Sequence, residues 1–152
     1  MANSATMCNV DDLAFYQELA DLMNAHPETY EGLGEVDLTL GVVLTGTGGD
    51  DLRIRLRFED LGCTGVSLLG DGEEADCDCW LAGDIGAWSE MFDDIVANGR
   101  ATGRSTVNSL TLIGDRIRAR GDDPMGVDRF FRFNQTIQQF LDGAAQLAPA
   151  AA

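Results

Sequence analysis

Hydrophobic positions first follow a helical period along the chain. Between Asp11 and His26, apolar residues fall three and four positions apart, which is typical of one face of an amphipathic helix. Pro27 ends this helix near Ala25, because the residue before a proline is disfavoured in the α conformation. Asp11 and Asp12 lie where a helix N-terminus favours negative charge. The sequence therefore predicts a first helix that begins near Asp11.

The pattern then changes to a period of two. Apolar and polar residues alternate over 36–44 and again over 52–58, as in strands that are covered on one face. The segment between them, Gly46-Thr-Gly-Gly-Asp-Asp51, has the composition of a turn. We therefore expect these two strands to form a hairpin.

Two further strands are expected next, over 62–69 and 74–81, joined by a tight turn at Gly70-Asp-Gly72. Together the four strands predict an antiparallel meander. Cys77 and Cys79 are two residues apart in the last of them, so their side chains are expected on one buried face.

A second helix is expected after Asp84, which is placed to cap its N-terminus, and Gly99 is placed for its C-terminal cap. This is the most hydrophobic predicted helix. Its apolar positions follow the 3.6-residue period: Ile85, Trp88, Met91, Phe92, Ile95 and Val96.

The last third of the chain predicts a fifth strand and a closing helix. Residues 110–113 and 116–120 have an extended pattern, whereas 126–141 has the apolar spacing of one long helix. The fold class predicted from this order is α+β, with a five-stranded, mostly antiparallel sheet that helices cover on one face.

The length of 152 residues and the hydrophobic content of 45% suit one domain with its own core. We expect a flexible N-terminus over 1–10, a single domain over 11–142 and a disordered, alanine-rich tail over 143–152. No stretch approaches the roughly 20 apolar residues of a membrane-spanning helix. The N-terminus also lacks the basic and apolar regions of an export signal, so a cytoplasmic protein is expected.

Charge narrows the possible partners. The chain carries 26 acidic and 10 basic residues, a formal net charge of −16, and every basic residue is arginine. Broad electrostatic attraction to nucleic acid is therefore excluded. Six arginines lie on two predicted strands, and pairing with carboxylates on neighbouring strands is favoured over an anion or lipid-headgroup patch: Arg53, Arg55, Arg57, Arg116, Arg118 and Arg120.

Common catalytic and metal-binding patterns are missing from the sequence. The single histidine, His26, lies at the end of a helix, and no Gly-x-Ser-x-Gly turn presents a nucleophile. The four cysteines lack the spacing of a zinc site and are expected to be free thiols: Cys8, Cys63, Cys77 and Cys79. The sequence thus predicts no enzyme, no cofactor and no metal.

The last two predicted helices have more large apolar residues than one face of a small sheet requires. If they do not fill the space that they share, an apolar cavity remains that suits an apolar ligand. Ordinary core packing explains the same composition equally well.

The order of these elements resembles the sterol carrier protein 2 (sterol-binding) family over residues 11–142. The residues that carry the resemblance are Leu52-Arg-Ile-Arg-Leu-Arg-Phe-Glu-Asp60, Gly70-Asp-Gly-Glu-Glu-Ala-Asp76, Asp84-Ile-Gly-Ala-Trp-Ser-Glu-Met91 with Asn98-Gly99, and Ile117-Arg-Ala-Arg-Gly-Asp122.

This resemblance implies that the helices enclose an apolar tunnel for a fatty-acyl chain, a sterol or a phospholipid, and that the protein carries its ligand without catalysis. It implies ligand contacts from eight residues: Trp88, Met91, Phe92, Ile95, Phe130, Phe133, Ile137 and Phe140. Two features depart from the family. The first helix is acidic where membrane-delivering members have a basic one, and the segment 100–113 replaces a short connection with polar residues that rim a pocket or form a structured loop.

Three functional hypotheses follow. The first is non-catalytic binding or transfer of a hydrophobic ligand, without stable membrane insertion. The second is a protein interaction or accessory module, for example a homodimer, which meets its partner through a sheet edge or an apolar helix face. The third, an enzyme that uses Asp115 or Asp122 on an acyl or steroid substrate, requires a carboxylate with a raised pKa in the pocket.

Overall fold

The first helix forms where the sequence predicts it. The computed structural model describes residues 10–46, 48–112 and 116–147, and α1 spans Leu13–Ala25. Asp12 caps this helix, because its carboxylate accepts a hydrogen bond of 3.0 Å from the backbone N–H of Ala14. The short helix α2 (Glu28–Glu31) follows directly after Pro27.

Five strands form one sheet in the order β3-β2-β1-β4-β5. The predicted hairpin is confirmed, since β1 and β2 pair antiparallel with Leu40 opposite Leu56. β2 also pairs antiparallel with β3, and β4 with β5. The strands are β1 (Val36–Thr45), β2 (Leu52–Asp60), β3 (Gly62–Leu68), β4 (Cys79–Asp84) and β5 (Ile117–Arg120).

The predicted four-strand meander is wrong in its last step. β4 does not pair with β3 but lies parallel to β1, with Val42 opposite Leu81. The residues predicted to start the fourth strand instead form a 3-10 helix, η1 (Glu73–Asp76), which leads the chain back across the sheet. Alternation of apolar residues gives the period of a strand but does not give its pairing partner.

The second predicted helix is confirmed as α3 (Ile85–Asn98). The carboxylate of Asp84 accepts a hydrogen bond of 2.7 Å from the N–H of Ala87 at its start. Gly99 ends it with φ = 83°, a left-handed conformation that favours glycine. The sequence therefore predicts both caps of α3 correctly.

Residues 107–112 differ from the prediction. The sequence predicts an extended segment from residue 110, whereas the structure has the helix α4 (Val107–Leu112), preceded by η2 (Gly103–Ser105). The hydroxyl of Thr106 accepts a hydrogen bond of 3.1 Å from Ser109 N–H, and Gln138 accepts one of 2.6 Å from Val107 N–H. These side chains satisfy the exposed donors at the start of a short helix.

The predicted closing helix is divided in two. α5 (Pro124–Arg132) and α6 (Asn134–Asp142) are separated by Phe133, whose φ and ψ of −104° and 14° are not helical. A further short helix, α7 (Ala144–Leu147), lies in the segment for which a disordered tail is predicted, and Ala144 is fully buried. Buried small side chains in an alanine-rich tail allow the helices to approach closely.

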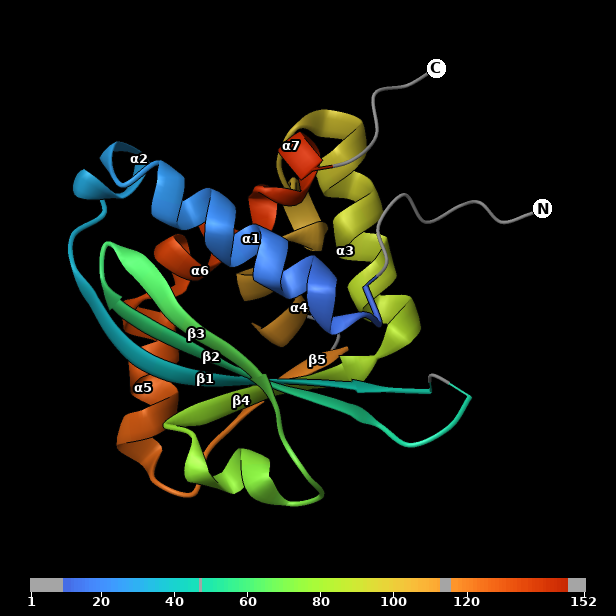
Figure 1. Cartoon of the computed structure of the whole chain (residues 1–152). Helices are drawn as coiled ribbons and strands as arrows, with labels where there is room; N and C mark the ends of the chain where they lie inside the picture. The colour runs from blue at the N-terminus through green and yellow to red at the C-terminus, as the bar shows by residue number, and fades with distance from the viewer. Residues whose placement is uncertain (1–9, 47, 113–115, 148–152) are drawn as a thin grey trace.

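The helices α1, α3, α4, α6 and α7 gather on one face of the sheet, η1 lies on the other, and α5 runs beside β1 and β4 (Figure 1). α5 is positioned by a close contact, because a Cβ added to Gly126 would lie 1.8 Å from the carbonyl oxygen of Asp78. The inward strand residues are apolar and buried, as at Leu38, Leu56 and Leu81. The α+β fold with a five-stranded, mostly antiparallel sheet is therefore confirmed.

Candidate functional site

Seven of the eight predicted ligand residues lie together in the apolar interior. Each is at most 1% exposed and belongs to one cluster between the helices and the sheet: Trp88, Met91, Phe92, Ile95, Phe130, Ile137 and Phe140. They come from three helices that are separated in the sequence. These seven residues, which the family resemblance implies as ligand contacts, therefore lie on the inward faces of their helices.

One part of this interior is closed by contacts between rings. Phe15 packs edge-on against Phe92 with ring centroids 5.0 Å apart, and Phe15 and Tyr16 are 5.1 Å apart in the same manner. The indole N–H of Trp88 donates a hydrogen bond of 3.2 Å to the carbonyl oxygen of Val43. We call these residues, Phe15, Tyr16, Trp88 and Phe92, the closed core.

The eighth residue, Phe133, lies apart from the other seven. It is partly buried and lines a surface groove of about 430 Å³ beside the ends of β1 and β2. Apart from Val36, the other residues of the groove are charged, and two of them, Asp37 and Arg57, form an ion pair at 2.8 Å. The break between α5 and α6 places Phe133 here.

A second opening lies where α1 and α2 meet α6 and α7. This pocket of about 110 Å³, which we call the helical seam, is lined by apolar and polar side chains, and polar atoms make up most of its exposed lining. The walls are Leu19, Leu22, Met23, Tyr30, Phe140 and Gly143, and the rim is His26, Thr29, Gln139 and Gln146. Phe140 also packs edge-on against Phe58 of the sheet at 5.1 Å. Its ring therefore separates the pocket from the interior.

The two sides of the helical seam meet closely at a glycine. A Cβ added to Gly143 would lie 3.0 Å from a methyl carbon of Leu22 and 3.5 Å from one of Leu19. On the far side, α1 is tied to β3 by Asn24, which donates to the carbonyl oxygen of Cys63 at 2.8 Å and accepts from its N–H at 2.9 Å.

A half-buried carboxylate lies beside the helical seam. One oxygen of Asp142 accepts hydrogen bonds from Ala101 N–H at 3.1 Å and from the Gln138 amide at 2.9 Å. Burial raises the pKa of Asp142 above its usual 3.8, and these hydrogen bonds oppose that change. Burial also raises the pKa of Tyr30, so its hydroxyl stays protonated at neutral pH.

The α1 side of the seam was not among the predicted ligand residues. Leu19, Leu22 and Met23 form part of the apolar stripe that predicted the first helix, and they line the pocket. The stripe was visible in the sequence, but only the structure shows that it faces α6. The polar segment 100–113, considered as a pocket rim, contributes none of the residues that line the seam.

The cysteines in the described part are free and buried. Burial raises the pKa of Cys63 and of Cys77 to about 11, and that of Cys79 to about 12, so all three are protonated at neutral pH. Cys77 and Cys79 do not share a face. Cys79 aligns with the inward Leu40, whereas the sulfur of Cys77 lies 3.5 Å from the outward Cβ position of Gly41. Cys8 lies outside the described residues.

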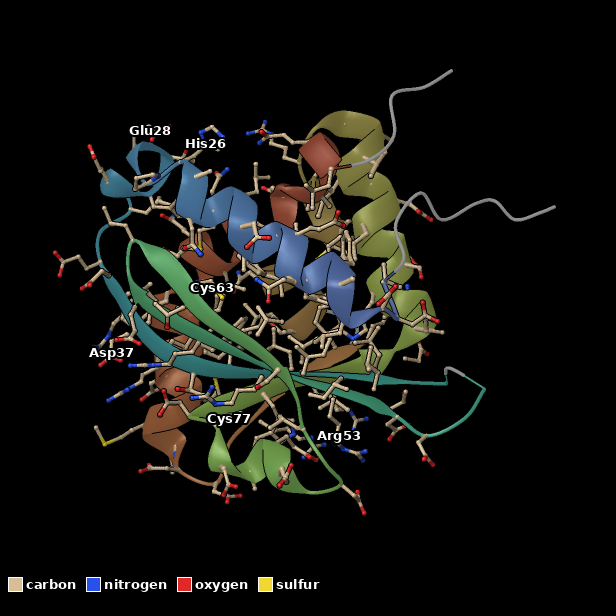
Figure 2. All side chains as sticks on the ribbon, viewed as in Figure 1. His26, Glu28, Asp37, Arg53, Cys63 and Cys77 are labelled. Carbon is tan, nitrogen blue, oxygen red and sulfur yellow. The ribbon has the colours of Figure 1, made fainter. Side chains whose placement is uncertain are left out.

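Arginines of β2 form ion pairs over the outer face of the sheet. Figure 2 labels one member of each of two pairs, Arg53 and Asp37. Arg57 pairs across the strands with Asp37, as the sequence predicts. Arg53 instead pairs with Glu74 of η1 at 3.2 Å and with Asp71 at 3.1 Å. These ion pairs hold η1 and the turn before it against the outer face of the sheet.

No group of three or more potential metal ligands was found among residues 10–46, 48–112 and 116–147. In the same ranges, every helix is too short or too polar to span a bilayer.

The helix-covered sheet has the fold of sterol carrier protein 2. A crystal structure of sterol carrier protein 2 superposes with a TM-score of 0.68 at 14% identity, over 91% of this chain and 98% of the other. The solution structure of a conserved hypothetical protein from Thermus thermophilus, described as possibly a sterol carrier protein, gives 0.63 at 18% identity, over 99% and 97% of the two chains.

Comparison of the sequence with known proteins identifies no family. No family model matches the chain, and no curated protein matches it. At these identities the structural similarity establishes the fold, including strand order and the helices on one face.

Proposed function

We propose that this protein binds a hydrophobic ligand without catalysis, in the cytoplasm, and that the ligand enters the apolar interior through the helical seam. The ligand classes are a fatty-acyl chain, a sterol or a phospholipid. The observation that carries the proposal is a pocket lined in part by apolar side chains, Phe140 among them, in a sterol carrier fold. The predicted contacts at Trp88, Met91, Phe92 and Ile95, and at Phe130, Ile137 and Phe140, belong to one buried apolar cluster.

Binding requires the seam to widen. Its volume of about 110 Å³ is below the roughly 300 to 1,000 Å³ of typical ligand sites. Rotation of the Phe140 ring and a shift of α6 away from Leu22 would join the pocket to the interior. Each methylene then buried contributes about 0.8 kcal/mol, which offsets the cost of separating α1 from α6.

The chemistry of the described residues supports carriage over catalysis. The three buried thiols are held protonated by their raised pKa values. His26 is half exposed and pairs with Glu28 rather than with a nucleophile. Asp142, the buried carboxylate at the seam, receives two hydrogen bonds on one oxygen and serves to join α6 to residue 101.

The first test is purification under native conditions, organic extraction and mass spectrometry, together with the mass of the intact native protein. We expect a lipid that co-purifies in stoichiometric amount. A ligand-free mass, combined with no binding of a fluorescent fatty acid, would overturn the proposal. A mass that doubles with concentration in that case would favour the interaction module.

The second test fills the seam. Leu22→Trp places a larger side chain in the pocket at a partly exposed position, and it is expected to weaken binding of the neutral dye Nile red about tenfold or more. Leu112→Trp, at a residue that is 63% exposed, is the matched control and should leave binding unchanged. Equal affinities of the two variants would show that ligands do not enter through the seam.

A further inference from the structure

The rim of the helical seam can form hydrogen bonds but holds no fixed positive charge. Among the ten described residues that line the pocket there is no arginine or lysine. Three neutral polar side chains surround the opening, those of Thr29, Gln139 and Gln146. Within the described residues, none of the three makes a side-chain hydrogen bond. Their donors and acceptors are therefore available to a bound molecule.

The charged groups around this rim are mainly acidic. Residues 11–31, which form the α1 side, contain six carboxylates and no arginine. His26 is committed to Glu28 at 3.2 Å, and Figure 2 shows this pair at the junction of α1 and α2. Below the rim lies Asp142, which interacts with Arg100 and with Asp94. The Arg100 guanidinium thus already interacts with a carboxylate.

We infer that the site takes a lipid with a neutral polar head, such as a hydroxyl or an ester, and discriminates against a carboxylate or phosphate head. This inference rests on the proposed function and specifies its ligand class. An anionic head seated at the rim faces the carboxylates of the α1 side and finds no partner of opposite charge, which disfavours its binding. A hydroxyl or ester instead exchanges hydrogen bonds with the amides of Gln139 and Gln146.

The test compares amphiphiles with the same chain and different heads. Dodecanol, dodecanoate and dodecyltrimethylammonium compete with Nile red for the full-length protein, below their micellar concentrations and above neutral pH. We expect dodecanol to displace the dye at about tenfold lower concentration than dodecanoate. The cation shows how much the protein's overall negative charge contributes, because it shares the chain and lacks hydrogen-bond donors.

Two variants with the same charge change isolate the rim. Gln139→Arg adds a guanidinium at the rim, and we expect it to strengthen dodecanoate binding about tenfold relative to dodecanol. Gln135→Arg adds the same charge at an exposed position of α6 outside the pocket, and the head preference should stay as in the wild type.

The outcomes separate the two proposals. Dodecanoate binding as tightly as dodecanol, or equal shifts in both arginine variants, would overturn the neutral-head inference and leave ligand binding intact. Failure of the dye and of all three amphiphiles to bind would overturn the proposed function, and the inference with it.

Discussion

The closed core and the helical seam are both built from apolar side chains on helices, yet one is sealed and the other is open. In the closed core, three aromatic rings pack edge-on and the Trp88 indole is fixed by a hydrogen bond to Val43. In the seam, aliphatic side chains face a glycine, Gly143, and the rim side chains are polar. Edge-on contacts hold the rings of the closed core against one another, whereas a pocket lies beside the helices that meet at Gly143.

This difference shows that burial and ligand contact are separate properties. Trp88 and Phe140 are both buried, but of the two it is Phe140 that lines the helical seam. Variants in the two regions should therefore affect different measurements: stability for the closed core, and ligand exchange for the seam.

The largest expected effect is in the closed core. Trp88→Ala should lower the free energy of unfolding by about 3 to 5 kcal/mol, because it leaves a cavity and removes the partner of Val43. Urea denaturation measures this change. Phe140→Leu, at the seam, should cost less, since its site borders an existing pocket. Equal losses would remove the distinction between the regions.

The next largest loss of stability is expected at Gly126, where α5 closely approaches the backbone of Asp78. Gly126→Ala places a Cβ against the Asp78 carbonyl, so α5 must move and we expect a loss of about 1 to 3 kcal/mol. Thermal unfolding measures it. Gly32→Ala serves as a control because nothing lies within 4 Å of its added Cβ. A Gly126→Ala variant as stable as that control would show that α5 does not depend on this approach.

A pair of tyrosines compares the two regions directly. The Tyr16 hydroxyl donates a hydrogen bond of 2.7 Å to Val10 in the closed core, so Tyr16→Phe should cost about 1 kcal/mol. Tyr30 lines the seam, and its hydroxyl makes no hydrogen bond with another described residue. Tyr30→Phe should therefore change the free energy of unfolding by less than about 0.5 kcal/mol. Chemical denaturation measures the free energy of unfolding of both variants. A larger loss in Tyr30→Phe than in Tyr16→Phe would contradict this ordering.

A further small effect depends on pH. The folded-state pKa of Asp142 is raised above 3.8, so its ionised form destabilises the fold at neutral pH, and this penalty disappears as pH falls below that value. Asp142→Asn keeps the oxygen that accepts both hydrogen bonds. We expect it to be more stable than the wild type by less than about 1 kcal/mol at neutral pH, with no gain in acid. Melting temperatures across pH measure the difference in stability between the two proteins. A gain in stability of Asp142→Asn that grows in acid would contradict the raised pKa of Asp142.

Local signals in the sequence were sufficient for most elements. Asp84 and Gly99 mark the ends of α3 through their capping chemistry, and alternation over 36–44 identifies β1. These features depend on neighbours within a few residues, so a single sequence contains the information that predicts them. The inward faces of the helices were predictable for the same reason.

Features that depend on distant partners were not predictable. β4 lies parallel to β1 because η1 returns the chain across the sheet, and alternating residues do not encode that route. The break at Phe133 interrupts an otherwise continuous helical pattern. The seam arises because α1 faces α6, which requires the tertiary arrangement. The eight candidate contacts remain a prediction until a ligand is identified.

The contact between Asn24 and Cys63 also affects how the sheet ends. β3 is an outer strand, and an outer strand offers unpaired backbone groups to any other extended chain. The Asn24 amide occupies both the N–H and the carbonyl of Cys63, as a neighbouring peptide group would. A strand that approached this end of β3 would have to displace α1. At Cys63, one side chain therefore leaves no backbone group free for a second strand, which disfavours aggregation through this end of β3.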